Sequence, residues 1–130
     1  MVIIILLFLS YKWEDREYVN GLEGLLNNPN NQYRHLTDRE REDHRSQGER
    51  AWKDYIRNKI RNCDALICLI GQNTHNATGV IYELEVANSM GIKIIPVRIP
   101  ETTAASPNII RQRNVLNWNA KEINDELSRN

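Results

Sequence analysis

The stretch DALICLIG, residues 64–71, decides the fold of this chain. It is an unbroken apolar run between an aspartate and a glycine, which is typical of a strand buried on both faces of a sheet. Residues 1–10, MVIIILLFLS, and residues 92–100, IKIIPVRIP, have the same character. Buried strands of this kind occur in parallel sheets whose two faces are both covered by helices.

Helical patterns separate these strands, with apolar side chains repeating every three or four residues. They cover residues 13–26, 49–62 and 79–91. QYRHL and NVLNW are shorter candidate strands, and residues 119–130 form a closing helix that begins near Asn119 or Ala120. The alternation predicts one α/β domain of three layers over residues 1–130. Its mainly parallel, five-stranded sheet is expected in the flavodoxin-like order 2-1-3-4-5.

Pro96 is unusual inside the strand predicted over residues 92–100. Proline has no backbone N–H to donate to a neighbouring strand. The residue therefore predicts either a position near the edge of the sheet or a bend in the strand.

The composition excludes several classes of protein. The 17 basic and 17 acidic side chains balance, which disfavours a nucleic-acid-binding domain. The basic run at residues 44–61 is expected to be a solvated helix face, although a local patch stays open. Cys63 and Cys68 have no zinc spacing and suggest a reduced, cytoplasmic compartment, with Cys68 buried. Residues 1–10 lack a signal-peptide pattern and fall short of the roughly 20 residues that span a membrane.

The candidate ligand site follows from the topology. In flavodoxin-like sheets the crevice lies at the carboxyl ends of the strands, between the first and the third. The loops there are SYKWED, residues 10–15, and GQNTHNATG, residues 71–79. Neither is a glycine-rich phosphate loop or a nucleophile elbow, and the three histidines have no metal-ligand spacing. No metal site and no bound cofactor are expected.

Glu83 lies in the first turns of the helix that faces this crevice. A carboxylate there can bind ribose hydroxyls, or can stabilise positive charge on a ribosyl carbon. It can equally be a solvated acid that is favoured by the helix dipole. Glu85 lies about 200° around the helix from Glu83 and is expected to face away from the site.

Two segments resemble TIR domains. LFLSYKWEDREYVNGLEGLL, residues 7–26, resembles the opening of these domains, and residues 60–99 resemble their middle. SQGERAWKDYIRNKIRNCDALICLIGQNT followed by YELEVA is more specifically similar to the TIR-like branch that includes the ThsB-type subunit of bacterial Thoeris antiphage defence. The resemblance covers residues 3–99 and rests on the order and separation of the motifs.

The resemblance implies a catalytic residue. Catalytic TIR domains use a glutamate on this helix to cleave the nicotinamide–ribose bond of NAD+, and Glu83 corresponds to it by position. Many of these domains carry a tryptophan four residues earlier, where this chain has Gly79.

The resemblance also implies a substrate-binding set on the two crevice loops. Trp13 can stack on a cationic ring or pack as a core aromatic, and His75 can carry a proton or be an exposed loop residue. The expected set is Ser10, Tyr11, Lys12, Trp13, Asn73, Thr74 and His75.

The resulting hypothesis is an NAD+-cleaving enzyme that makes an ADP-ribose-derived signal for a separate effector protein. Attack by water would give linear ADP-ribose, and attack by an internal hydroxyl would give a cyclic isomer, which is the outcome that the resemblance suggests. Self-association through TIR surfaces is expected, and nucleic acid and membranes are not expected as partners. The alternative is a TIR-like interaction module without activity. A flavodoxin-like mononucleotide binder ranks last, because SYKWED is bulky and charged where such proteins carry Ser, Thr and Gly.

Overall fold

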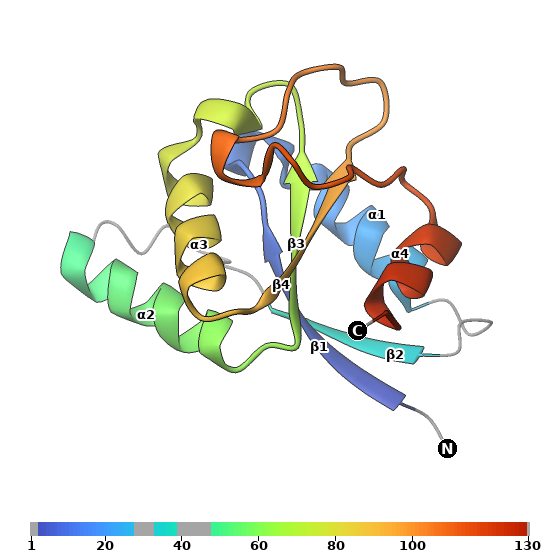
Figure 1. Cartoon of the computed structure of the whole chain (residues 1–130), viewed down its shortest axis with the longest axis horizontal. Helices are drawn as coiled ribbons and strands as arrows, with labels where there is room; N and C mark the ends of the chain where they lie inside the picture. Colours follow the sequence, from blue (N-terminus) through green and yellow to red (C-terminus); the bar gives the residue numbers. More distant parts are fainter. Residues whose placement is uncertain (1–2, 28–32, 39–47, 130) are drawn as a thin grey trace.

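A sheet of four parallel strands runs through the centre of the molecule (Figure 1). The computed structural model describes residues 3–27, 33–38 and 48–129. The strands are β1 (Ile3–Ser10), β2 (Tyr33–Asp38), β3 (Ala65–Ile70) and β4 (Lys93–Arg98). The helices are α1 (Glu17–Leu26), α2 (Glu49–Arg61), α3 (Thr78–Ser89) and α4 (Ala120–Leu127). Short 3-10 helices are η1 (Trp13–Asp15), η3 (Thr74–Asn76) and η4 (Asn108–Ile110).

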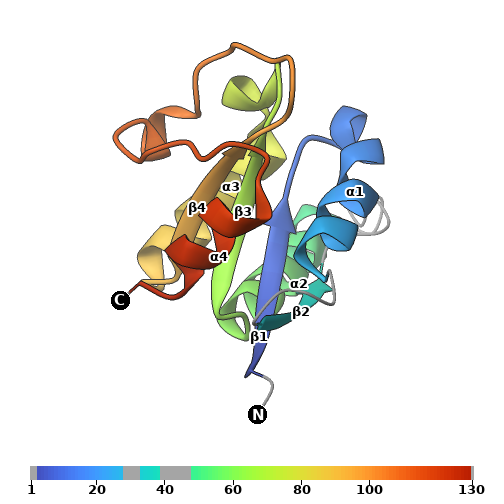
Figure 2. The same cartoon turned by 90° about the vertical axis from the view of Figure 1, so that its right-hand side faces the viewer.

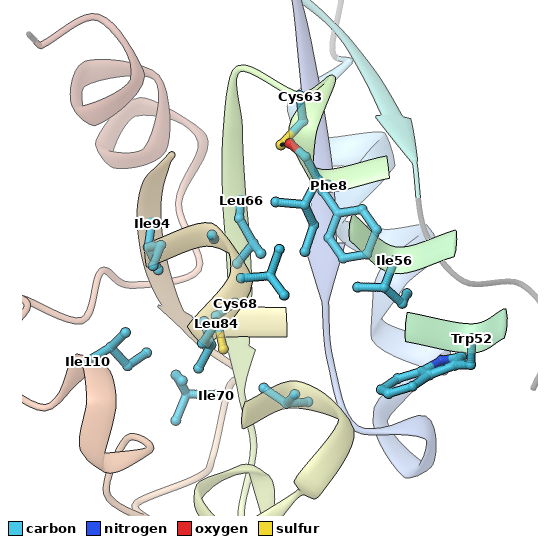
Figure 3. Packing of buried hydrophobic residues seen from close by; sticks show 14 residues of the cluster. Phe8, Trp52, Ile56, Cys63, Leu66, Cys68, Ile70, Leu84, Ile94 and Ile110 are labelled. Atoms are coloured by element: carbon cyan, nitrogen blue, oxygen red, sulfur yellow. Dashed lines mark hydrogen bonds between the residues drawn. The ribbon is translucent and has the colours of Figure 1, made fainter. Parts of the chain in front are cut away.

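Two helices cover each face of the sheet, as the two views in Figures 1 and 2 show. Alternate residues of a strand point to opposite faces, so β1 sends Phe8 toward α2 and α3, and Leu7 and Leu9 toward α1 and α4. Figure 3 shows Phe8 between Leu66 of β3 and Ile56 of α2. Every residue of β3 is buried, which confirms that residues 65–70 form a strand covered on both faces.

The prediction of a five-stranded sheet is wrong. The described residues form a four-stranded sheet in the order β2-β1-β3-β4. Residues 114–118 were expected to add a fifth strand, but they contribute only an isolated parallel bridge between Val97 and Leu116.

Pro96 explains why this bridge does not extend toward Asn114. Leu116 N–H donates to Pro96 O, and Arg98 N–H donates to Leu116 O. In a strand, the N and O atoms of one residue point to the same side, so the Pro96 nitrogen also faces outward. It carries no hydrogen, and the ladder ends there. The predicted edge position of Pro96 is confirmed, because β4 is the outermost strand of the order.

The last helix begins where the sequence indicates. The Asn119 side chain accepts a hydrogen bond from Glu122 N at 3.0 Å, which makes Asn119 the N-cap of α4. At the other end, Lys93 Nζ donates to the carbonyl oxygens of Glu126 and Arg129. A cation at this position satisfies free carbonyls and complements the helix dipole. Among the described helices, none has the length and apolar character needed to cross a bilayer.

Both cysteines are free and buried (Figure 3), and we predict that they are inert in the folded protein. Burial raises the pKa of the Cys63 thiol to about 11. Burial, followed by the nearby charge of Glu83, raises the pKa of Cys68 further. At pH 8 a disulfide reagent should therefore modify native protein at least about 100-fold more slowly than protein unfolded in urea, since the thiolate is the reactive form. Rapid modification of Cys63 in native protein would contradict its burial.

Candidate active site at the ends of β1 and β3

A hydrogen bond between Ser10 and Glu83 lies at the centre of the candidate site. Ser10 is the last residue of β1 and is fully buried, and Glu83 lies on α3 with 6% of its surface exposed. Ser10 Oγ donates to Glu83 Oε1 at 2.7 Å. The bond joins residues that are 73 positions apart in the sequence. It fixes one carboxylate oxygen at the carboxyl end of the sheet, where the topology predicts the crevice.

The helical repeat of α3 explains why this carboxylate is buried. Val80, Leu84 and Ala87 form the buried side of the helix, and Glu83 lies three residues after Val80 and next to Leu84. Glu85 is exposed on the other side. Glu83 is thus not a solvated acid, because the sheet-facing side of α3 carries it against β1.

The loop after β3 is held by Thr74. This side chain is fully buried, and its Oγ1 accepts from Gly71 N at 2.8 Å and donates to Leu69 O at 3.3 Å. Its hydroxyl therefore ties the start of η3 back to the backbone at the end of β3. A direct contact between Thr74 and a substrate stays a prediction.

Replacing Thr74 by Val should lower the free energy of unfolding by roughly 1–3 kcal/mol, because Gly71 N–H would be buried without its acceptor. Valine keeps the shape of threonine, so the loss would report the hydroxyl. Urea denaturation followed by circular dichroism measures it. Thr103→Val, at an exposed position, serves as the control and should change stability by under about 0.5 kcal/mol. Equal stability of Thr74→Val and wild type would contradict the role of the hydroxyl.

The loop after β1 reaches across to the loop after β3. Glu14 accepts from Asn73 Nδ2 at 3.0 Å, and its other oxygen lies 2.9 Å from Lys12 Nζ. These two contacts, with Asn73 contributing most, hold the pKa of the Glu14 carboxyl below its usual value. Lys12 and Asn73, two residues of the predicted binding set, are thereby brought together through Glu14.

Asp15 makes a second, closer contact between the two loops. A Cβ placed on Gly71 would lie 2.4 Å from Asp15 Oδ2 and 2.9 Å from its Cγ, so the carboxyl packs directly on the glycine. Oδ2 is buried and has no hydrogen-bond partner among the described residues. Burial, and then the charge of Glu14, raises the pKa of Asp15.

The other predicted residues lie more openly. Trp13 is 52% exposed, and the Arg16 guanidinium lies 5.1 Å from its ring centroid, so it is not a core aromatic. Tyr11 is half-buried against the apolar cluster beneath α1 and α4. His75 is exposed in η3.

Sequence reasoning missed Glu14 and Asp15 as members of this region. Their signal was available, because both acids lie in the SYKWED loop at the predicted crevice. Their partners across the crevice were not visible, since pairing of Glu14 with Asn73 depends on how the two loops approach each other.

Comparison with known proteins places this arrangement in a family. The family described as "Thoeris protein ThsB, TIR-like domain" matches residues 8–104. The structure is similar to the TIR domain of the Toll-related receptor TRR-2 from Hydra magnipapillata, with a TM-score of 0.60 and 18% identity over 93% of this chain and 90% of that one. It is also similar to a prokaryotic SEFIR domain, with a TM-score of 0.54 and 18% identity over 93% and 86% of the two chains. At this identity, these structures show the fold alone.

Among curated proteins, no sequence matches the chain significantly. The family match includes Ser10 and Glu83 together with both crevice loops, and it covers most of the chain. The protein therefore belongs to the family of TIR-like domains of the Thoeris protein ThsB.

Proposed function

We propose that this chain cleaves the nicotinamide–ribose bond of NAD+, with Glu83 as the catalytic residue. The observation that carries the proposal is the Glu83 carboxylate, which is fixed by Ser10 at the carboxyl ends of the parallel strands. Membership of a TIR-like family supports it, because some TIR domains catalyse this reaction.

Cleavage of the nicotinamide–ribose bond needs little more from the protein than a negative charge held close to the ribose. When the bond breaks, its electron pair goes to the nicotinamide nitrogen, which leaves as a neutral molecule. Positive charge develops on the ribosyl carbon, and a fixed carboxylate can stabilise it without reorganising. The hydrogen bond from Ser10 holds the Glu83 carboxylate in one orientation, and in this proposal the carboxylate lies beside the ribose of the bound substrate.

The product depends on the nucleophile that attacks the ribosyl carbon. Attack by water, with loss of a proton, gives ADP-ribose. Attack by a group of the same molecule, with loss of a proton, gives a cyclic ADP-ribose, whose formula has one water less than that of linear ADP-ribose. We propose the cyclic product as a diffusible signal to a separate effector in antiphage defence, as the family suggests.

A second candidate function is a non-catalytic interaction module. The same burial of Glu83 favours it, because a carboxylate that bonds to Ser10 also acts as a tether between α3 and β1. Gly79, which stands where many catalytic TIR domains have tryptophan, favours it as well.

Incubation of concentrated, purified protein with NAD+ separates the two functions. Mass spectrometry would follow NAD+, nicotinamide, ADP-ribose and the cyclic isomers. Consumption by wild type and not by Glu83→Gln supports the enzyme. Equal consumption by both proteins overturns the role of Glu83, and consumption by neither favours the interaction module.

A further inference from the structure

Residues Lys12–Asp15, here called the strap, connect β1 to α1 and touch the loop after β3 at two points. The outer point is the hydrogen bond from Asn73 to Glu14, which spans 59 residues of sequence. The inner point is the packing of the Asp15 carboxyl on Gly71. Ser10 lies two residues before the strap, and the loop it touches leads into α3, which carries Glu83. The strap thus joins the two segments that flank the Ser10–Glu83 pair.

The outer contact stabilises the closed position of the strap, and the inner contact destabilises it. The Glu14–Asn73 hydrogen bond, supported by Lys12, holds the strap against the opposite loop. At the inner contact, by contrast, Asp15 Oδ2 is removed from water without a hydrogen-bond partner among the described residues. Such a group is costly to bury, and the raised pKa of Asp15 has the same cause. Opening the strap would return this carboxyl to water, so the outer hydrogen bond holds the strap closed against the cost of the inner contact.

The low exposure of Ser10 and Glu83 is consistent with a strap that is closed in this structure. Glu83 has 6% of its surface exposed and Ser10 has none, so little of the Glu83 side chain is open to a ligand in this arrangement. Gly71 is the residue that permits closure, because a Cβ there would meet the Asp15 carboxyl well inside contact distance.

We propose that the strap is a latch that closes over the Glu83 site through the Glu14–Asn73 hydrogen bond and the Asp15–Gly71 contact, and that it opens to admit the dinucleotide. The inference rests on the proposed function for the identity of that ligand. The closure of the strap can be tested without turnover.

Carboxyl labelling tests it directly. A water-soluble carbodiimide with glycinamide, under single-hit conditions, labels accessible carboxyls, and peptide fragmentation separates Glu83 from Glu85. In wild type, Glu83 should react far more slowly than Glu85, which is exposed on the same helix. Glu14→Ala removes the outer bond and should speed labelling of Glu83 about three- to tenfold, the range expected for one hydrogen bond. Labelling of Glu85 should not change.

Two further variants complete the test. Glu14→Gln keeps an oxygen that can accept from Asn73, so Glu83 in this variant should react at a rate close to that of wild type. Gly71→Ala forces the Asp15 carboxyl away from residue 71. Because this disrupts the inner contact, labelling of Glu83 should become faster. Unchanged labelling of Glu83 in both Glu14→Ala and Gly71→Ala would overturn the latch.

NAD+ turnover measured on the same samples distinguishes the two proposals. Faster turnover by Glu14→Ala, together with faster labelling, supports both. Faster labelling without NAD+ consumption in any variant would overturn the proposed function and leave the latch standing. Turnover by wild type with unchanged labelling in the variants would overturn the latch alone.

Discussion

Glu83→Gln should reduce NAD+ consumption by at least about 100-fold, the usual scale for removing a group that stabilises charge in the transition state. Glutamine is uncharged and cannot stabilise the positive ribosyl carbon. It still offers an oxygen that accepts from Ser10 Oγ, so the link between β1 and α3 persists. The variant should therefore fold normally, with an unchanged circular dichroism spectrum.

The matched control is Glu85→Gln, which removes the same charge from an exposed position on the same helix. It should retain most of the activity, because Glu85 lies away from Ser10 and the crevice. Initial rates of nicotinamide release for the three proteins provide the measurement. A Glu83→Gln protein as active as wild type would remove the central claim, as would equal losses in both variants.

Phe8→Ala should lower the free energy of unfolding by about 3–5 kcal/mol, the range seen when a buried phenylalanine is truncated. Phe8 is fully buried between the sheet and α2, where Ile56 and Leu66 lie beside it (Figure 3). Close packing leaves little room for these neighbours to collapse into the cavity. A domain of this size has about 5–15 kcal/mol of stability in all, so the variant should be close to unfolding at 37 °C.

Urea denaturation of Phe8→Ala beside Ile4→Ala tests this expectation. Ile4 lies on the same strand with 58% of its surface exposed, so its truncation should cost far less. Similar losses for the two variants would mean that the effect comes from strand propensity and not from the core.

The four strands, and the place where Ser10 and Glu83 meet, were predictable because their signals lie in the apolar runs and in the segments that follow them. The apolar run at residues 65–70 is typical of a strand that is buried on both faces of a parallel sheet. The loops at the carboxyl ends of such strands form the ligand crevice. The predicted strand order placed Ser10 and Glu83 beside the same crevice. In the structure the two side chains form a hydrogen bond.

The errors came from features that depend on tertiary contacts. NVLNW has the apolar pattern of a strand, but it forms only one bridge to β4, and Pro96 has no N–H with which to extend that bridge toward Asn114. The strap was missed for the same reason, since the approach of Asp15 to Gly71 is a close contact between two loops. No periodicity in the sequence records such a contact. The residue that reports it is Gly71, whose missing side chain makes the approach possible.

The proline on β4 has a consequence for assembly. An open strand edge is a template on which another chain can add by backbone pairing, and soluble proteins block such edges. On β4, Pro96 has no N–H to offer, and Leu116 already occupies the Pro96 carbonyl and the Arg98 N–H. Edge-to-edge growth of one sheet into that of another copy is therefore obstructed at this strand. Copies that associate on this side must meet through side chains rather than through a continuous backbone ladder.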